Sequence, residues 1–281
     1  MATPLAPLRG LLSQLSFTNF PLKRYDVPPG ATPSAAQQWT LYCYGPGFND
    51  DVTSFDPQSL KWIAYLTFAK VDFRIEHCNE PLMSPNGQLP YLTLGRKQCV
   101  AADDILALLS EEAVALPTVA PEVTPRMTAL IALVENTVGD AVAHYLWCES
   151  DNYQALTSAA YTGHYPWPVN RFQACTLRRE HTRALTLQPM TGPELYRAAL
   201  DALRALSDHL GDADKYFFDT ETPTLLDAVV FAYLFPILSA PMPQAHFRAQ
   251  IKEIPRLEPY VRRVWATWFD PSRSPVAELE L

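Results

Sequence analysis

The chain has 281 residues, of which 48% are hydrophobic and 19% are charged, and its formal net charge is −8. This length supports two small domains with a substantial hydrophobic core, and the composition is that of a folded globular protein. The acidic balance argues against a nucleic-acid binder, which needs a basic surface to neutralise phosphates. The arginines cluster only at Arg178, Arg179 and Arg183 and at Arg262 and Arg263, and such short runs predict solvated helix faces.

The cysteines and histidines form no metal-binding pattern. The number of cysteines is odd and their spacing is wide, without a CxxC pair, which predicts reduced thiols in a cytosol-like compartment. The six histidines include no HExxH motif and no paired Cys/His spacing. We therefore expect neither a metal nor a cofactor. The cysteines are Cys43, Cys78, Cys99, Cys148 and Cys175.

Two features bear on membrane contact. The longest apolar run, Leu225 to Leu238, contains Asp227 and Pro236 and would reach only about 21 Å as a helix, against about 30 Å of hydrocarbon. The N-terminal segment has no secretory pattern, and Arg9 is its only charge before Lys23, unlike an arginine-rich presequence. The sequence thus predicts contact with a membrane from outside, or through a partner.

Residues 1–38 are predicted to form an N-terminal arm that ends in a proline-rich linker. Its leucines recur at helical spacing, which supports a short amphipathic helix and a disordered or loosely docked tail about equally. The linker contains Pro28, Pro29, Gly30 and Pro33. The candidate partner contacts on the arm are Leu5, Leu8, Leu12 and Leu15.

A first domain is predicted over residues 39–115. The alternating, aromatic segment WTLYCY at 39–44 indicates a strand. Asp56 before Pro57 is typical of a helix N-cap followed by proline in the first turn. The helix that follows, to about Ala69, is apolar on both faces and is therefore expected to be buried on both sides.

Three more strands and a helix complete this domain. The strands are predicted at 71–78, 88–94 and 98–100, and Asp103 or Asp104 is predicted to cap a helix that ends near Ser110. The strand-helix-strand start requires a parallel pair, and the later strands form an antiparallel hairpin. This order indicates a thioredoxin-like arrangement.

The second domain, predicted over residues 122–270, is expected to be helical. Thr124 and Pro125 begin a long helix whose apolar stripe continues to Leu146. Residues 149–192 are predicted to be irregular, with YPWPVN as an extended segment. Pro193 is predicted to open another amphipathic helix, which Gly211 ends.

Two motifs resemble the glutathione-transferase fold. MSPNGQLPYL, from Met83 to Leu92, places Pro90 at the start of the third strand, where thioredoxin-like domains have a proline after a cis bond. TPTLLDAVVFAYLFPIL, from 222 to 238, resembles the buried helix of the transferase C-terminal domain, and Thr224 and Asp227 are expected to form its capping box. The order and separation of these motifs predict a thioredoxin-like domain followed by a helical bundle domain.

The finer resemblance is to the metaxin family, over residues 39 to 270. FDPQSLKWIAYLTFAKVDFRIEHCN resembles the family's first helix and second strand, WCESDNY followed by YPWPVN its linker region, and IPRLEPYVRRVWATWF its last helix. The short length and the leucine-rich arm leading into FPLKRYDVP look most like the smaller metaxin-like subunit of the fungal mitochondrial sorting and assembly machinery.

This resemblance implies a function and partners. The protein would be a peripheral, non-catalytic subunit on the cytosolic face of the mitochondrial outer membrane. It would bind the barrel-forming core subunit and a second metaxin-like subunit, and it would help to receive β-barrel precursor proteins. Membrane contact would run mainly through these partners.

The alternative is a cytosolic glutathione-dependent transferase or reductase. Such an enzyme needs an acidic or amide residue plus serine to hold the γ-glutamyl end, and alignment on Ile105 places Ala101 and Ala102 there. The candidate hydroxyls for a thiolate are Tyr42, Tyr44 and Ser54. The loop after the first strand would repel the anionic tripeptide through Asp50, Asp51 and Asp56.

Overall fold

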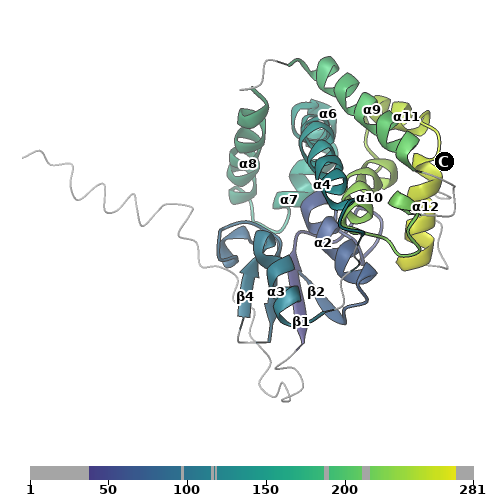
Figure 1. The fold of residues 1–281 in the computed structure, drawn as a ribbon. Coiled ribbons are helices and arrows are strands. Elements are labelled where there is room, and N and C mark those ends of the chain that lie inside the picture. Colours follow the sequence, from purple (N-terminus) through teal and green to yellow (C-terminus); the bar gives the residue numbers. More distant parts are fainter. Residues whose placement is uncertain are drawn as a thin grey trace, which may run out of the picture.

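The computed structural model describes residues 38–95, 98–114, 117, 119–186, 190–210 and 216–269. The arm leucines and Gly211 lie outside these residues. Within them, a small sheet at one end of the molecule is followed by a larger helical part (Figure 1). The domain limits 39–115 and 122–270 stay predictions.

The sheet has four strands in the order β2-β1-β3-β4. The first two strands are parallel, and the other neighbouring pairs are antiparallel. This topology confirms the thioredoxin-like arrangement, because a helical crossover joins the parallel pair and the last two strands pair antiparallel. The strands are β1 (Trp39–Cys43), β2 (Phe73–His77), β3 (Tyr91–Leu94) and β4 (Gln98–Ala101).

The two faces of the sheet differ in what they bury. Leu41 and Cys43 of β1 and Leu92 of β3 are fully buried and join the main core. On the opposite face, the rings of Tyr42 and Tyr91 stack at 4.6 Å between centroids. The alternation of side chains along β1 therefore directs its smaller residues into the core and an aromatic pair to the outer face.

Helix α2 (Pro57–Phe68) lies between the sheet and helix α10 (Figure 1). Asp56 is its N-cap and accepts a hydrogen bond from the Ser59 amide at 2.8 Å, as the sequence predicts. Helix α3 (Ile105–Glu111) follows a 3₁₀ turn, η4 (Ala102–Asp104). Asp104 stands at the N-cap of α3, but its side chain makes no capping hydrogen bond, so that detail of the prediction is wrong.

The first long helix of the second half is continuous from residue 124 to residue 148, in agreement with the predicted stripe. Two of its segments are π-helical, which widens the turn and often marks a functional site. The next segment is short and includes a third π-helical turn. These elements are α4 (Thr124–Leu133), η5 (Val134–Val138), α5 (Gly139–Ala143), η6 (His144–Cys148), α6 (Ser150–Asn152), η7 (Tyr153–Thr157) and α7 (Ser158–Thr162).

The prediction that residues 149–192 are irregular is wrong. Besides the short helical segments, this region forms α8 (Val169–Thr186), and YPWPVN is the turn that enters it. Among the described side chains of α8, only Val169, Ala174 and Leu185 are buried. Because so few apolar residues mark its inner face, the sequence has no stripe from which this helix could be recognised.

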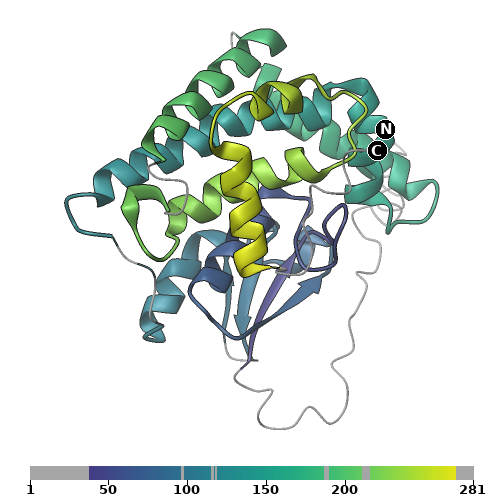
Figure 2. The same ribbon diagram turned by 90° about the vertical axis from the view of Figure 1, so that its right-hand side faces the viewer.

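The remaining helices surround α10 (Leu225–Ser239), which is buried along almost its whole length. Helix α9 (Gly192–His209) begins as predicted, with proline in its first turn, and Thr191 and Glu194 form its capping box. Helices α11 (His246–Lys252) and α12 (Leu257–Trp268) close the structure near α10 (Figure 2). No described helix combines the length and apolar character needed to cross a membrane.

Candidate functional site

The first candidate site is the end of the sheet where β1 and β2 finish. Carboxyl ends of parallel strands are a common location for ligand sites. The Leu89–Pro90 peptide bond here is cis, which confirms that prediction, and Gly45–Pro46 is cis as well. An added Cβ at Gly45 would stand 2.1 Å from Nδ1 of His77, so a larger residue here would have to displace the imidazole.

The candidate hydroxyl of Ser54 is fully engaged. Ser54 is buried, donates a hydrogen bond to the Tyr44 carbonyl at 2.6 Å and accepts one from the Asp56 amide at 3.0 Å. These bonds fold the loop after β1 back onto the strand. A thiolate would therefore have to displace a structural hydrogen bond in order to reach this hydroxyl.

The two tyrosines are equally unsuited to stabilise a thiolate. Burial, followed by the charge of Asp56, raises the pKa of Tyr44 far above its usual range. The Tyr44 ring packs edge-on against Tyr161 at 5.0 Å. Burial, followed by Glu76, also raises the pKa of Tyr42, whose ring is stacked on the neighbouring strand. Both environments oppose the build-up of negative charge.

The carboxylates of the nearby loop have structural partners. Asp56 accepts hydrogen bonds from the Ser59 hydroxyl at 2.8 Å and from the Tyr161 hydroxyl at 2.9 Å, so it links the two parts of the fold. Asp50 accepts bonds from the Thr53 amide at 2.6 Å and hydroxyl at 2.7 Å. Their charges remain at the end of the sheet, where they disfavour an anionic ligand.

The position of the γ-glutamyl contacts lies at the start of α3. Ala101 is the last residue of β4, and Ala102 begins the 3₁₀ turn that leads into the helix. Both side chains are methyl groups and offer no hydrogen bond. Only backbone groups are left at this position to hold a glutamyl carboxylate or amine.

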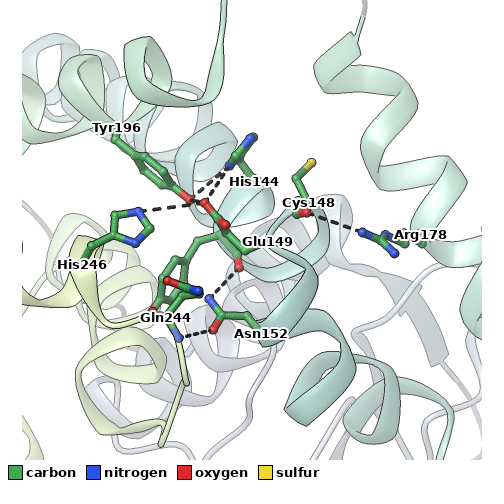
Figure 3. A network of polar contacts seen from close by, with 9 residues as sticks. His144, Cys148, Glu149, Asn152, Arg178, Tyr196, Gln244 and His246 are labelled. Atoms are coloured by element: carbon green, nitrogen blue, oxygen red, sulfur yellow. Dashed lines mark hydrogen bonds and ion pairs between the residues drawn. The ribbon is translucent and has the colours of Figure 1, made fainter.

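A second candidate site is a polar network beside the break between η6 and α6 (Figure 3). The Tyr196 hydroxyl lies 3.0 Å from Oε1 of Glu149 and 3.1 Å from Nδ1 of His144. His246 of α11 stands 4.0 Å from the same carboxylate, and its ring meets the Tyr196 ring edge-on. The network therefore joins the long helix, α9 and α11 through a single carboxylate.

The shifted pKa values in this network suit a structural role for its side chains better than a role in proton transfer. Burial, followed by Glu149, raises the pKa of Tyr196 far above its usual range, so the phenol remains a hydrogen-bond donor. Burial lowers the pKa of His144; the charge of Glu149 opposes this shift and His246 adds to it. Gly192 packs against the imidazole, since an added Cβ would lie 2.6 Å from its Nε2 and Cε1 atoms.

Next to this network, buried side chains hold neighbouring loops. Asn152 is fully buried, donates to the Tyr145 carbonyl at 3.1 Å and accepts from the Gln244 amide at 2.9 Å. Arg178 of α8 donates from Nε to the Trp147 carbonyl at 2.9 Å, and its guanidinium lies 4.2 Å from the centre of the Tyr153 ring. These bonds satisfy backbone groups that the wide turns leave without helical partners.

The sequence does not predict this network. Its side chains come from segments up to about a hundred residues apart, and single histidines, glutamates and tyrosines carry no spacing signal. The only pointer is the WCESDNY motif, which contains Glu149 and Asn152. Among the described residues, no group of three or more histidines, cysteines and acids could hold a metal ion.

The second fold motif, with Thr224 and Asp227, forms the expected capping box at the start of α10. Oδ2 of Asp227 accepts from the Thr224 amide and hydroxyl, each at 2.7 Å. Oδ1 accepts from the Tyr260 hydroxyl at 2.7 Å and from the Phe217 amide at 3.1 Å. Asp227 is fully buried, and all four bonds tie it to protein groups rather than to an open site.

Comparison with known proteins shows which families the chain is similar to. Residues 59–178 match the family described as Tom37, outer mitochondrial membrane transport complex protein, and residues 199–264 match a glutathione S-transferase C-terminal domain. Metaxin-1 of Macaca fascicularis is 27% identical over 240 residues, which cover 82% of this chain and 74% of that protein. Metaxin-3 of Xenopus laevis is also 27% identical, with 82% and 76% covered. These matches support the metaxin/Tom37 family.

Human metaxin-1 shows the same 27% identity, but the chain spans only 51% of its length. Solved structures confirm the fold of the chain. A β-etherase, LigF, from a Sphingobium strain has a TM-score of 0.56 at 17% identity and covers 86% of this chain and 98% of its own. A glutathione transferase of Phanerochaete chrysosporium, GSTFuA3, has a TM-score of 0.57 at 14% identity and covers 83% and 98%. At such identities the metaxin-like chain shares only its fold with these enzymes.

Proposed function

We propose that this metaxin-like protein is a non-catalytic, peripheral subunit of the mitochondrial outer-membrane sorting and assembly machinery. It acts from the cytosolic face, binds the barrel-forming core subunit and a second metaxin-like subunit, and supports the reception of β-barrel precursors. Its features are most like those of the smaller metaxin-like subunit. The Tom37 match supports the membrane system, and the resemblance described above supports the finer assignment.

One observation carries the non-catalytic part of the proposal. In a transferase fold, the side chains placed to serve the thiol or the glutamyl group are methyl groups, a serine held in structural hydrogen bonds, and two packed tyrosines whose pKa values are raised. Ser54 is the clearest case, because both its donor and its acceptor bonds hold the loop after β1. A subunit that uses the fold as a rigid scaffold needs such bonds, whereas a thiol-activating enzyme needs a free hydroxyl.

Glutathione binding and turnover test this part directly. The protein should pass through a glutathione-affinity column and should not conjugate a reporter electrophile above the rate of the reaction without protein. A fungal transferase of the same fold serves as the positive control. Measurable turnover that disappears in Tyr42→Phe or Ser54→Ala would establish the enzyme alternative.

Membrane attachment is proposed to run through the barrel subunit. An acidic protein gains little from anionic head groups, and the arm carries little charge before Lys23. At physiological salt, the protein should remain in the supernatant with vesicles of outer-membrane lipid and should sediment once the barrel subunit is reconstituted in them. Strong binding to protein-free vesicles would contradict this route, and a variant with its arm leucines replaced by serine would show whether the arm is a lipid anchor.

A further inference from the structure

Helix α8 has one long exposed face that carries positive charge. Arg171, Cys175, Arg179 and Arg183 follow one another at intervals of four residues, and all four are exposed. At 3.6 residues per turn they fall within about 120° of the helix surface. Glu180, the acidic residue of the helix, falls about 60° beyond Arg183, at the border of this face, and no ion pair joins these two described side chains.

The arginines of this face differ from three arginines on other elements, each of which is paired with a carboxylate. Elsewhere, Arg74 pairs with Glu76 at 2.6 Å, Arg204 with Asp201 at 2.7 Å and Arg262 with Glu258 at 2.9 Å. In the part of the chain that the structure describes, no ion pair involves the three arginines of the α8 face. In a protein of net charge −8, this is a local concentration of uncompensated positive charge.

Two large exposed aromatic side chains lie near the N-terminal end of α8. Trp167, in the turn that enters α8, is 79% exposed, and Phe172 is 54% exposed. A tryptophan exposed to water lacks the large favourable free energy that burial of its ring would provide. Tryptophan and arginine together are the residue types most enriched where protein partners bind tightly.

The helix is held in place by Arg178, at the border of this face, and by His181, farther around the helix, so the exposed face is presented on a rigid element. Arg178 anchors α8 to the carbonyls at the end of η6, at 2.9 Å to Trp147 and 3.5 Å to Cys148. The His181 ring stacks on Trp147 at 4.3 Å. Figure 1 shows α8 at the edge of the helical part, where the other helices lie on one side of it and leave the opposite side uncovered.

From this charge, exposure and anchoring, we propose that the arginine face of α8, formed by Arg171, Arg179 and Arg183 with Trp167 and Phe172, docks an acidic segment of a partner protein. The inference rests on the proposed function, because it supplies one of the protein contacts that a peripheral subunit needs. From Arg171 to Arg183 the face is about 18 Å long, which about six extended residues would span.

Charge also distinguishes this partner from an anionic bilayer. A bilayer is an extended negative plane, and it would face the acidic remainder of the protein as well as the three arginines. A short acidic segment meets only the arginine face. The arm is excluded as the occupant by its own charges, since Arg9, Lys23 and Arg24 outnumber Asp26 there.

The test compares two variants with the same change in net charge. One carries Arg171→Gln, Arg179→Gln and Arg183→Gln; the other carries Arg74→Gln, Arg197→Gln and Arg204→Gln at exposed positions on other elements. Binding of a fluorescein-labelled oligo-glutamate peptide is followed by fluorescence anisotropy at low and at physiological salt. Circular dichroism verifies that both variants are folded.

We expect the natural chain to bind the peptide at low salt, with an affinity that falls as salt rises. The α8 variant should lose about tenfold or more, as expected for three surface ion pairs, while the matched variant stays within about twofold. Equal losses in both variants, or no binding by the natural chain at low salt, would overturn the proposal. Arginine-dependent binding to phosphatidylserine vesicles but not to the peptide would assign the face to lipid and overturn it too. Co-purification with the barrel subunit is a separate readout, so a failure here leaves the proposed function standing.

Discussion

Helices α10 and α8 belong to the same helical part but differ most in burial and polarity. Helix α10 is surrounded by protein and contains one charged residue, Asp227, whose carboxylate is bonded to four protein groups. Helix α8 is polar, buries few side chains and turns three arginines outward. The two helices therefore differ in role. Helix α10 organises the core, whereas the exposed side chains of α8 are not needed for packing and are available to a partner.

The largest effect is expected at α10. Asp227→Ala leaves the Phe217 and Thr224 amides and the Tyr260 hydroxyl without their acceptor in a site that water does not reach. Unsatisfied buried groups cost about 1–3 kcal/mol each, so we expect a loss of at least about 3 kcal/mol in the free energy of unfolding. Urea denaturation measures it. Asp227→Asn, which keeps the shape and part of the bonding, should lose less; an unchanged midpoint in Asp227→Ala would disprove the central role of this box.

A smaller effect is expected in the Glu149 network. Tyr196→Phe keeps the ring packing but removes the hydroxyl that joins Glu149 and His144. Loss of this bridge should cost about 1–2 kcal/mol in the free energy of unfolding, again by urea denaturation. Tyr153→Phe, on a neighbouring turn with no hydroxyl bond among the described residues, is the control and should change little. Equal effects of the two would mean that the bridge does not stabilise the fold.

At α8 the expected effect is local. Arg178→Gln removes the bonds from α8 to the Trp147 and Cys148 carbonyls. Hydrogen exchange should show faster opening of α8, by about fivefold to tenfold, while the amides of α10 keep their protection. Arg179→Gln, the next residue and exposed, is the matched control. Faster exchange throughout the chain would show that α8 is an integral part of the cooperative core.

The smallest effect concerns pH. The folded protein holds the pKa of His144 below its ordinary value, mainly through burial, so the unfolded chain binds a proton more readily. This contribution to stability is complete above the unfolded pKa of about 6.5 and is lost as the pH falls toward the folded value. His144→Gln should therefore flatten the fall in melting temperature between pH 7.5 and pH 5. An identical pH dependence in the variant would refute the assignment.

The same contrast explains what the sequence could predict. Helix α10 has a capping box and a continuous apolar run, and Pro90 stands in a recognisable loop, so the thioredoxin-like sheet and the buried helix follow from local patterns. Helix α8 has neither a stripe nor a strong cap, and it is held by Arg178 through contacts with residues about thirty positions away. Such contacts depend on the finished tertiary structure.

The candidate sites divide in the same way. The alanines at 101 and 102 are visible in the sequence as an absence of polar side chains. The hydrogen bond of Ser54 within its loop and the packing of Tyr44 on Tyr161 are not visible in the sequence. Both depend on the tertiary structure. The Glu149 network requires three helices to converge, which no spacing in the sequence encodes.

We propose that this fold serves a membrane protein assembly and not thiol chemistry. The most direct measurement is purification of the tagged full-length protein, at native abundance, from detergent-solubilised mitochondria, followed by mass spectrometry of what is retained. The account predicts that a barrel-forming outer-membrane subunit and a second metaxin-like protein are recovered together with it, in both the natural chain and the Tyr42→Phe variant, which keeps the stacked ring. Recovery of the intact protein without any outer-membrane barrel subunit, and with glutathione-conjugating activity, would contradict it.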